Sequence, residues 1–466
     1  MPFVAALKTL LGEHGVLTEA QDRAAFERDW RGLVQHPALA VAFPKTTEQV
    51  SEIVKLCAAH NIAIVPQGGN TGLVAGGVPI ANTPQLILSF NRMNTIRALD
   101  LEADSIIAEA GVPLARVREA AATAGRLFPV SFAADGTAQL GGAISTNAGG
   151  VQVLSYGNMR AQVLGLEVVL ADGAIWHGLH ALPKDNTGYD LKQVFIGAEG
   201  TLGLITAACL RLHPAPRAMA AALVGTGSAA QAMALFRAVR QVAGPALTLC
   251  EFMTAPAMQL GGTPPFAAPA YLLLEISALE DDATPQALLE RVLATALAEG
   301  TASDAVIAQS GQQRLALLGL REHIPEGELA AGGALKHDIA VPLGRMADMV
   351  AQAESFIAQH HPGCRLNIFG HLGDGNLHIN VRPPSGQSLA ALTPVKAAIT
   401  SGIEAIAVSL GGSFSAEHGI GQFRLSAMAA YKSPESLDLM RRLKQAFDPA
   451  GLFNPGKTIP PERLHD

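Results

Sequence analysis

The pattern of hydrophobic and polar positions predicts alternating short strands and helices in the first half of the chain. Residues 1–30 have helical spacing, and residues 46–49 (TTEQ) precede a second amphipathic stretch, as in a capped helix start. The apolar run 62–65 (IAIV) predicts a buried strand. Strands and helices then alternate, with dense glycine between them, until Pro214 and Pro216 mark a boundary.

After this boundary the pattern changes to alanine-rich helices, such as 286–298, and strands, such as 271–276. This alternation predicts a second α+β domain. The stretch 218–236 is long and uncharged, but glycines and Gln231 interrupt it. It therefore predicts a strand, a turn and the start of a helix rather than a membrane span. A last helix is expected at 434–447.

The composition is that of a folded chain with several domains. The chain has 466 residues, which is too long for one compact core, and 49% of them are hydrophobic against 16% charged. The net charge of −7 argues against a nucleic-acid partner. It also means that local cationic groups must capture any anionic ligand.

The cysteines exclude several classes of site. Cys57, Cys209, Cys250 and Cys364 are isolated and form no CxxC pair, which argues against a disulfide framework, a cysteine zinc site and an iron–sulfur cluster. They fit a reducing compartment. The N-terminal residues lack the basic start and the long apolar core of a signal peptide, so we expect a cytoplasmic protein.

Three glycine-rich segments, 66–72, 136–150 and 197–203, contain the first candidate chemistry. Glycines allow positive φ and let backbone N–H groups approach a ligand closely, and a row of such donors suits a pyrophosphate. One such segment by itself most often only makes tight turns, but three of them, each with Asn or Thr inside, favour a bound dinucleotide. None fits GxGxxG, which disfavours an ordinary nicotinamide site.

Residues 451–458 match the P-loop pattern, but we do not expect them to bind a nucleoside triphosphate. Pro455 removes a backbone donor, and Pro460 and Pro461 stand where a P-loop requires a helix.

Two histidines and a carboxylate form the second candidate site. His371 and His378 are seven residues apart and flank an Asp-Gly pair at 374–375, so a hairpin would bring both imidazoles together. Glu417 and His418 follow about forty residues later. Each histidine alone would be a hydrogen-bonded core or turn residue, but together the group favours a divalent-metal site with open positions. Zinc is preferred, with manganese or another divalent ion as the alternative, and the aspartate is expected to form the turn.

Two cationic residues, Arg321 and Lys336, are the candidates for binding an anionic substrate. An arginine can hold a carboxylate through two parallel hydrogen bonds, and a lysine adds a point charge. The alternative is that both only form surface salt bridges with Glu322 or Asp338.

The glycine-rich segments resemble the FAD-binding domain of the vanillyl-alcohol oxidase / p-cresol methylhydroxylase superfamily. From about residue 40 to 458 the chain resembles the FAD-linked D-2-hydroxyacid dehydrogenases of that superfamily, the D-2-hydroxyglutarate, D-lactate and glycolate dehydrogenase group. The resemblance implies an α+β protein with a two-subdomain FAD-binding domain at 1–215. It also implies a substrate and metal-binding domain at 216–422, with an antiparallel sheet and helices, and a C-terminal helical segment at 423–466 that returns to the flavin.

The resemblance also implies which residues contact FAD. Some members of the superfamily bind the flavin covalently through a histidine in the first segment, where this chain has Asn70, so we expect non-covalent FAD. The expected FAD contacts are Pro66, Gly68, Gly69, Asn70, Thr71, Gly72, Gly136, Thr137, Gly141, Gly142, Ser145, Thr146, Asn147, Gly149, Gly150, Glu199, Gly200, Ile205 and Asn454.

Roles for the second site follow from the same resemblance. The implied metal ligands are His371, His378 and Glu417, the implied base is His418, and the implied substrate contacts are Arg321, Lys336 and Asn380. One position departs from the pattern. Where some D-2-hydroxyglutarate enzymes have a threonine four residues after the arginine, this chain has Pro325, which cannot donate a hydrogen bond.

Together with these residues, the resemblance implies an FAD-dependent, metal-assisted dehydrogenase that oxidises a D-2-hydroxy acid to the 2-oxo acid. D-2-hydroxyglutarate is the preferred substrate, followed by D-malate, and the alternative is a D-lactate or glycolate dehydrogenase or oxidase. Electrons must pass to an external acceptor, such as electron-transfer flavoprotein, a quinone pathway or dioxygen. A homodimer without a membrane span is expected. The rival classes are a non-catalytic electron-transfer subunit and a metal-dependent hydrolase without flavin.

Overall fold

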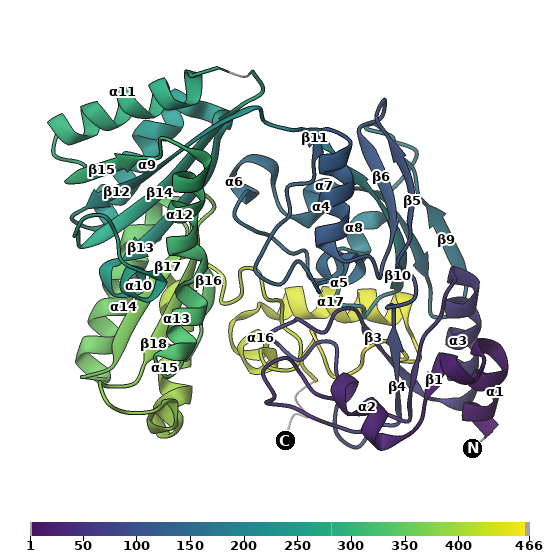
Figure 1. Cartoon of the computed structure of the whole chain (residues 1–466). Coiled ribbons are helices and arrows are strands. Elements are labelled where there is room, and N and C mark those ends of the chain that lie inside the picture. Colours follow the sequence, from purple (N-terminus) through teal and green to yellow (C-terminus); the bar gives the residue numbers. More distant parts are fainter. Residues whose placement is uncertain (1, 281, 462–466) are drawn as a thin grey trace. The chain divides into compact units, whose positions relative to one another are not determined.

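The computed structural model describes residues 2–280 and 282–461, which form two compact units (Figure 1). Unit 1 comprises Met1–Gly150, Gly157–Pro214 and Glu417–Asp466, and unit 2 comprises Val151–Tyr156 and Ala215–Ala416. The sequence predicts boundaries after residues 215 and 422, and the chain passes between the units after Pro214 and Ala416.

A four-stranded sheet in unit 1 has the order β1-β2-β4-β3. Its strands are β1 (Val16–Leu17), β2 (Ala40–Ala42), β4 (Gln85–Ser89) and β3 (Ala63–Gln67). β2, β3 and β4 run parallel, which requires crossover connections, and α3 (Thr47–His60) makes the first of them. Thr46 caps α3 by accepting a hydrogen bond from the backbone N–H of Gln49, which confirms the predicted helix start.

A five-stranded antiparallel sheet forms the second layer of unit 1, in the order β5-β6-β10-β8-β9. Its strands are β5 (Ile96–Asp100), β6 (Ser105–Glu109), β10 (Leu204–Arg211), β8 (Val163–Val169) and β9 (Ile175–Gly178). α4 (Leu114–Thr123) and α5 (Leu140–Ser145) pack into the same hydrophobic core through residues such as Val117 and Ile144. The other elements of unit 1 are α1 (Pro2–Leu11), η1 (Glu13–Gly15), α2 (Ala20–Glu27), β7 (Arg126–Leu127), α7 (Met159–Gln162), α8 (Lys192–Phe195), β11 (His213–Pro214), α16 (Leu425–Tyr431) and α17 (Pro434–Phe447).

The chain after α17 is fixed onto the four-stranded sheet. The buried carboxylate of Asp448 accepts hydrogen bonds from the backbone N–H of Leu452 (2.8 Å) and Phe453 (2.7 Å), and it pairs with Lys444 Nζ (2.5 Å). Phe453 is fully buried and forms a β-bridge with Ile64 in β3. The C-terminal segment therefore lies directly beside the strand that leads into the first glycine-rich segment.

Unit 2 is built on a seven-stranded antiparallel sheet in the order β15-β12-β14-β13-β17-β18-β16. In that order its strands are Asp304–Ile307, Ala218–Thr226, Ala270–Ala278, Leu247–Thr254, Arg365–His371, Asn376–Arg382 and Asp338–Ala340. The antiparallel sheet with helices is the α+β architecture that the resemblance implies.

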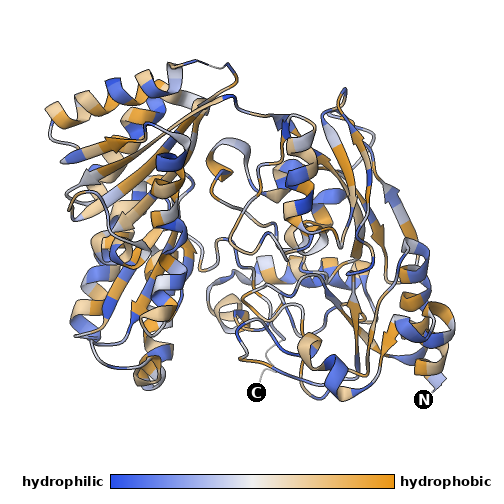
Figure 2. Cartoon of the chain, viewed as in Figure 1, coloured by the Kyte–Doolittle hydropathy of each residue, from blue (hydrophilic) through white to orange (hydrophobic). Residues whose placement is uncertain are grey.

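Helices cover the two faces of this sheet differently. On one face, α9 (Ala229–Ala243), α11 (Thr284–Ala298), α14 (Met346–His360) and α15 (Lys396–Ser409) enclose a large apolar core. On the other face, α10 (Ala255–Gly261), α12 (Gly311–Glu322) and α13 (Ile324–Ala330) cover a smaller one. Figure 2 shows hydrophobic and hydrophilic residues interleaved along α11, as expected for a helix with one face on a core.

A short segment within the predicted FAD-binding domain packs with unit 2. This segment contains α6 (Val153–Tyr156); Leu154 packs against the larger core of unit 2, and Ser155 Oγ donates a hydrogen bond to the carbonyl of Pro245 (2.7 Å). The sequence did not predict this, because the segment follows the second glycine-rich segment without a change in composition.

Among the described residues, one helical stretch, Leu389–Ser409, is long and apolar enough to cross a membrane by length and composition. Ile399, Ile403 and Ala407 on α15 within this stretch are fully buried in the protein, as in a core helix. The stretch is therefore weak evidence for a membrane span.

We expect Asp448→Ala to lower the free energy of unfolding by about 2–4 kcal/mol, because two buried backbone donors lose their acceptor. The matched control is Asp438→Ala in α17, whose ion pair with Arg442 (2.7 Å) is exposed. Its loss should cost less than about 1 kcal/mol. Urea unfolding measures both variants, and equal losses would contradict the role assigned to Asp448.

Candidate active site

The first two glycine-rich segments lie against each other in unit 1. A side chain at Gly69 would collide with the carbonyl of Thr137, and one at Gly150 would collide with the carbonyl of Ser131. A Cβ atom added at Gly68 would lie 3.8 Å from the Cα of Gly142, which is ordinary van der Waals contact. The glycines therefore allow the backbones of segments 66–72 and 136–150 to approach closely.

The third segment joins the second through backbone hydrogen bonds. The N–H of Gly197 donates to the carbonyl of Ile144 (3.0 Å), and the N–H of Glu199 donates to that of Ser145 (2.8 Å). Gly200 packs against the ring of Pro66, so all three segments meet. Asn454 also reaches this place, because its Nδ2 donates to the carbonyl of Glu199 (2.8 Å).

Backbone conformation marks the same region. Three residues on these segments, Asn70, Asn147 and Glu199, have φ of 51° or 52°, and Asn454 on the adjoining C-terminal segment has φ 43°, a region that non-glycine residues rarely adopt. Such conformations persist where the surroundings require them and are frequent at ligand sites. Asn70 and Asn147 are further fixed by side-chain hydrogen bonds with the carbonyl of Arg28 (2.8 Å) and the N–H of Arg160 (2.9 Å).

The glycine-rich segments leave several backbone positions open to a bound dinucleotide. Side chains at Gly72, Gly136 and Gly142 would meet no protein atom within 4 Å, so these backbone positions remain approachable. Gly142 lies in the first turn of α5, where backbone N–H groups and the helix dipole favour a phosphate. The side chain of Ile205 is buried in the core of the five-stranded sheet, and its predicted flavin contact stays a prediction.

Glu199 has a partner that sequence reasoning missed. Its buried carboxylate accepts hydrogen bonds from the N–H of Ile420 (2.7 Å) and Gly421 (2.8 Å). Burial raises the pKa of Glu199, and burial lowers the pKa of the neighbouring Lys457 to about 7 although Glu199 opposes this. Glu199 therefore holds the chain two residues after His418, and nothing in the sequence links positions so far apart.

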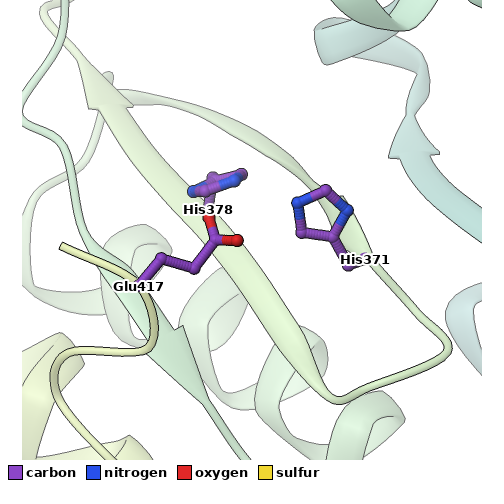
Figure 3. A group of neighbouring side chains, drawn as sticks. All are labelled: His371, His378 and Glu417. Carbon is purple, nitrogen blue, oxygen red and sulfur yellow. The ribbon is translucent and has the colours of Figure 1, made fainter. Parts of the chain in front are cut away.

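The candidate metal ligands come together in the structure. His371 ends β17 and His378 lies in β18, across a turn in which Asp374 Oδ1 accepts a hydrogen bond from the N–H of Asn376 (3.1 Å). One ligand atom from each of His371, His378 and Glu417 lies within 4.8 Å of the other two (Figure 3). Zinc bonds of about 2.0–2.2 Å place ligand atoms no more than about 4 Å apart, so small side-chain rotations would complete the site.

The position of Glu417 follows from the chain immediately before it. The N–H of Ala416 donates to the carbonyl of Asp338 (3.3 Å), and Asp338 is the cross-strand partner of His378. Asp338 Oδ1 also lies 3.7 Å from His378 Nδ1 and accepts a hydrogen bond from Asn376 Nδ2 (2.8 Å). One carboxylate thus lies beside a candidate ligand histidine, an arrangement that is common around metal sites.

The register of unit 2 places the predicted substrate contacts on the same sheet face as the histidines. Phe369 pairs with His378, and Asn367 pairs with Asn380, so these side chains lie on one face. The bridge between Leu335 and Val381 places Lys336 opposite Asn380. Arg321 reaches this face from α12, with its guanidinium carbon 4.7 Å from the centre of the Phe369 ring.

Two buried carboxylates that the sequence analysis did not single out hold these cations. Glu251 in β13 bonds His371 Nδ1 through one oxygen and Arg321 Nε (2.6 Å) through the other. Burial alone would raise the pKa of Glu251, but His371 and Arg321 lower it to about 2. A signal existed, because Glu251 is the one charged residue in the apolar strand LTLCEFMT.

Glu328 is the second carboxylate and is fully buried. It accepts hydrogen bonds from Asn367 Nδ2 and Asn380 Nδ2 (both 3.1 Å), and Lys336 Nζ lies 3.5 Å away. Lys336 is exposed at the surface, as one alternative supposed, but its ion-pair partner is Glu328 and not Asp338. Pro325 lies in the first turn of α13. A backbone N–H at this position would have no partner within the helix, so the helix tolerates a proline there without losing a hydrogen bond.

Comparison with known families supports both units. The family described as "FAD binding domain" matches residues 38–178, and "FAD linked oxidases, C-terminal domain" matches residues 215–458. Mitochondrial D-2-hydroxyglutarate dehydrogenase of Bos taurus is 37% identical over 459 residues, which cover 96% of this chain and 81% of that protein. The D-2-hydroxyglutarate dehydrogenase of Stutzerimonas stutzeri is 35% identical over 458 residues, with 97% of both chains covered.

Among solved structures, p-cresol methylhydroxylase with substrate bound matches with a TM-score of 0.76. The match covers 98% of this chain and 96% of that chain at 17% sequence identity, and it shows the fold alone. The vanillyl-alcohol oxidase / p-cresol methylhydroxylase type of FAD-binding fold, expected from the glycine-rich segments, is confirmed.

Gly142→Ala and Gly69→Ala should separate cofactor binding from folding. Gly142→Ala is expected to leave the apoprotein as stable as before, since the new methyl meets no protein atom, while FAD affinity falls at least about tenfold. Gly69→Ala should lower the melting temperature of the apoprotein itself, because its methyl collides with Thr137. Thermal unfolding and FAD fluorescence quenching measure the two effects. Unchanged FAD binding by Gly142→Ala would show that this glycine does not face the cofactor.

Proposed function

Since this chain belongs to the FAD-linked oxidase family, in the group that contains the D-2-hydroxyglutarate dehydrogenases, we propose that it oxidises D-2-hydroxyglutarate to 2-oxoglutarate. The observation that carries this proposal is the shared sheet face of unit 2. On it, the two candidate ligands His371 and His378 accompany two cations, the buried Arg321 and the exposed Lys336. A substrate with one carboxylate beside a hydroxyl and a second carboxylate at its far end would use both cations.

The reaction removes a proton from the hydroxyl group and a hydride from C2. In the proposed mechanism, Arg321 binds a substrate carboxylate and Lys336 adds a positive charge, while Asn380 contacts the substrate from β18. His418 accepts the hydroxyl proton, which a neutral imidazole can do near pH 7. Bound FAD supplies the hydride acceptor, a chemistry that side chains lack.

The proposed metal site consists of His371, His378 and Glu417. Two imidazoles and one carboxylate suit zinc best and also accept manganese. A bound divalent ion would lower the pKa of the substrate hydroxyl and fix its orientation. Because neighbouring residues project in different directions, Glu417 can bind a metal while His418 faces the substrate.

Other properties belong to the same proposal. We propose non-covalent FAD, because Asn70 stands where some relatives carry a flavin-binding histidine. Electrons leave to an external acceptor, such as electron-transfer flavoprotein, a quinone pathway or dioxygen. We further propose a cytoplasmic homodimer. The isolated spacing of the four cysteines, with no CxxC pair, supports a reducing compartment.

One observation favours a second candidate substrate class. Pro325 cannot offer the hydroxyl group that some D-2-hydroxyglutarate enzymes have at this position, so binding of a distal carboxylate would be weaker. D-malate, whose second carboxylate lies closer to the hydroxyl, and the monocarboxylates D-lactate and glycolate are therefore the competing substrates.

Anaerobic bleaching of the flavin tests the substrate. We expect D-2-hydroxyglutarate to reduce the flavin fastest, D-malate more slowly, and L-2-hydroxyglutarate not at all. The measurement is stopped-flow absorbance with a panel that includes D-lactate and glycolate. Faster bleaching by D-lactate or glycolate would replace the proposed substrate, and a protein that cannot bind FAD would contradict the whole assignment.

His418→Ala tests the proposed base. We expect kcat to fall by about 10²–10⁴-fold, because proton removal loses its acceptor, while the flavin absorbance of the purified protein stays normal. The control is His360→Ala, whose exposed imidazole hydrogen-bonds to the carbonyl of Phe356 and packs on its ring within the same helix. Normal turnover by His418→Ala would reject the base assignment.

Metal removal tests the candidate ligands. Chelation should abolish oxidation of D-2-hydroxyglutarate without releasing FAD, and added Zn²⁺ or Mn²⁺ should restore it. His378→Ala should reduce the metal content determined by elemental analysis. Full activity after chelation, with no metal detected, would show that the three ligands have another role.

A further inference from the structure

We propose that Glu251 is a positioning residue that couples the metal site to substrate binding, because one buried carboxylate holds both His371 and Arg321. The inference rests on the proposed function, in which His371 is a metal ligand and Arg321 binds a substrate carboxylate. It adds a residue to which nothing in the sequence assigned a role.

The geometry divides the two oxygens of Glu251 between two partners. One oxygen bonds His371 Nδ1, and the other lies 2.6 Å from Arg321 Nε. Glu251 and His371 are cross-strand partners in β13 and β17, so their side chains lie together on one sheet face. All three residues are buried and belong to unit 2, so the arrangement is complete within that unit.

The contact with His371 selects one form of the imidazole. A neutral histidine has one protonated and one unprotonated ring nitrogen, and a carboxylate at Nδ1 favours the proton there. The lone pair is then on Nε2, where a divalent ion needs it. Such outer contacts typically change metal affinity by about 10–100-fold when they are removed.

The contact with Arg321 fixes the plane of the guanidinium. Glu251 occupies the Nε–H, and the ring of Phe369 lies under the guanidinium at 4.7 Å. Of the five N–H groups of an arginine, the four on the terminal nitrogens are left to meet a carboxylate. An arginine whose plane is already fixed loses less conformational freedom when the substrate binds.

Charge gives a second reason for the coupling. A divalent ion at His371 and the cation of Arg321 repel each other in a buried region where water screens little. The carboxylate between them reduces this repulsion. Removing its charge should therefore weaken metal binding and substrate binding together, which a purely structural ion pair would not do.

The same sheet face offers a matched control pair. Glu275 in the adjacent strand β14 is also buried. Its carboxylate forms an ion pair with Arg314 of α12, with 2.6 Å between Oε2 and Nη2. It also lies near Thr248 Oγ1 (3.4 Å), and neither Arg314 nor Thr248 is a proposed ligand or substrate contact. Replacing Glu275 thus removes an equivalent buried charge without touching the proposed site.

The experiment compares Glu251→Gln, Glu251→Asp and Glu275→Gln in the FAD-loaded full-length protein. Zn²⁺ affinity is measured by equilibrium dialysis without substrate, and KM and kcat are measured with D-2-hydroxyglutarate. We expect Glu251→Gln to weaken Zn²⁺ binding about 10–100-fold and to raise KM, and Glu275→Gln to leave both within about twofold. Glu251→Asp, which keeps the charge but is one methylene shorter, should lie between Glu251→Gln and the unmodified protein.

The outcomes separate this inference from the proposed function. If the unmodified protein binds Zn²⁺ and Glu251→Gln binds it equally well, the coupling role of Glu251 is rejected while the proposed function stands. If both glutamine variants weaken Zn²⁺ binding equally, the effect is structural and the inference also fails. If the unmodified protein binds no metal yet oxidises the substrate, the proposed metal site itself is wrong. Should Glu251→Gln fail to fold, the aspartate variant decides by the same two measurements.

Discussion

A buried charge must be paired, and this requirement organises the candidate active site of unit 2. Burying Glu251, Glu328 and Asp338 would be costly without partners, and each has at least one nearby cation, histidine or amide donor. Antiparallel pairing determines which residues can serve, because it sends alternate side chains to opposite faces. The apolar positions of the same strands face a helical layer and form the core, so a single register supplies both stability and chemistry.

Local features of the chain were predictable from the sequence. The capped start of α3, the strand before the first glycine-rich segment and the Asp-Gly turn between the two histidines depend on neighbouring residues, and all three are present in the structure. The FAD-binding fold and the enzyme class depended on the resemblance carried by the glycine-rich segments. Without the resemblance, the glycine-rich segments supported only a bound dinucleotide, and the histidines with Glu417 supported only a divalent-metal site.

Long-range partners were not predictable from the sequence. Glu251 precedes His371 by 120 residues, and Glu199 precedes Ile420 by 221, so only the folded chain shows these pairs. A lone glutamate in an apolar strand is a warning that a buried partner exists, but it does not say which. Segment 151–156 was missed for the same reason, because packing against a distant core leaves no mark in local composition.

The exchange of chain between the units has a consequence for synthesis on the ribosome. Unit 1 needs Glu417–Asp466 to cover β3 and to bring Asn454 to the glycine-rich segments. Roughly 200 residues of unit 2 are translated in between, which takes about 10–40 s at about 5–20 residues per second. During this interval the strand β3 and the first glycine-rich segment lack the cover of residues 417–461, so the nascent chain cannot complete unit 1 until these residues have been translated. A chaperone that binds the exposed strand β3 would therefore act mainly during this interval.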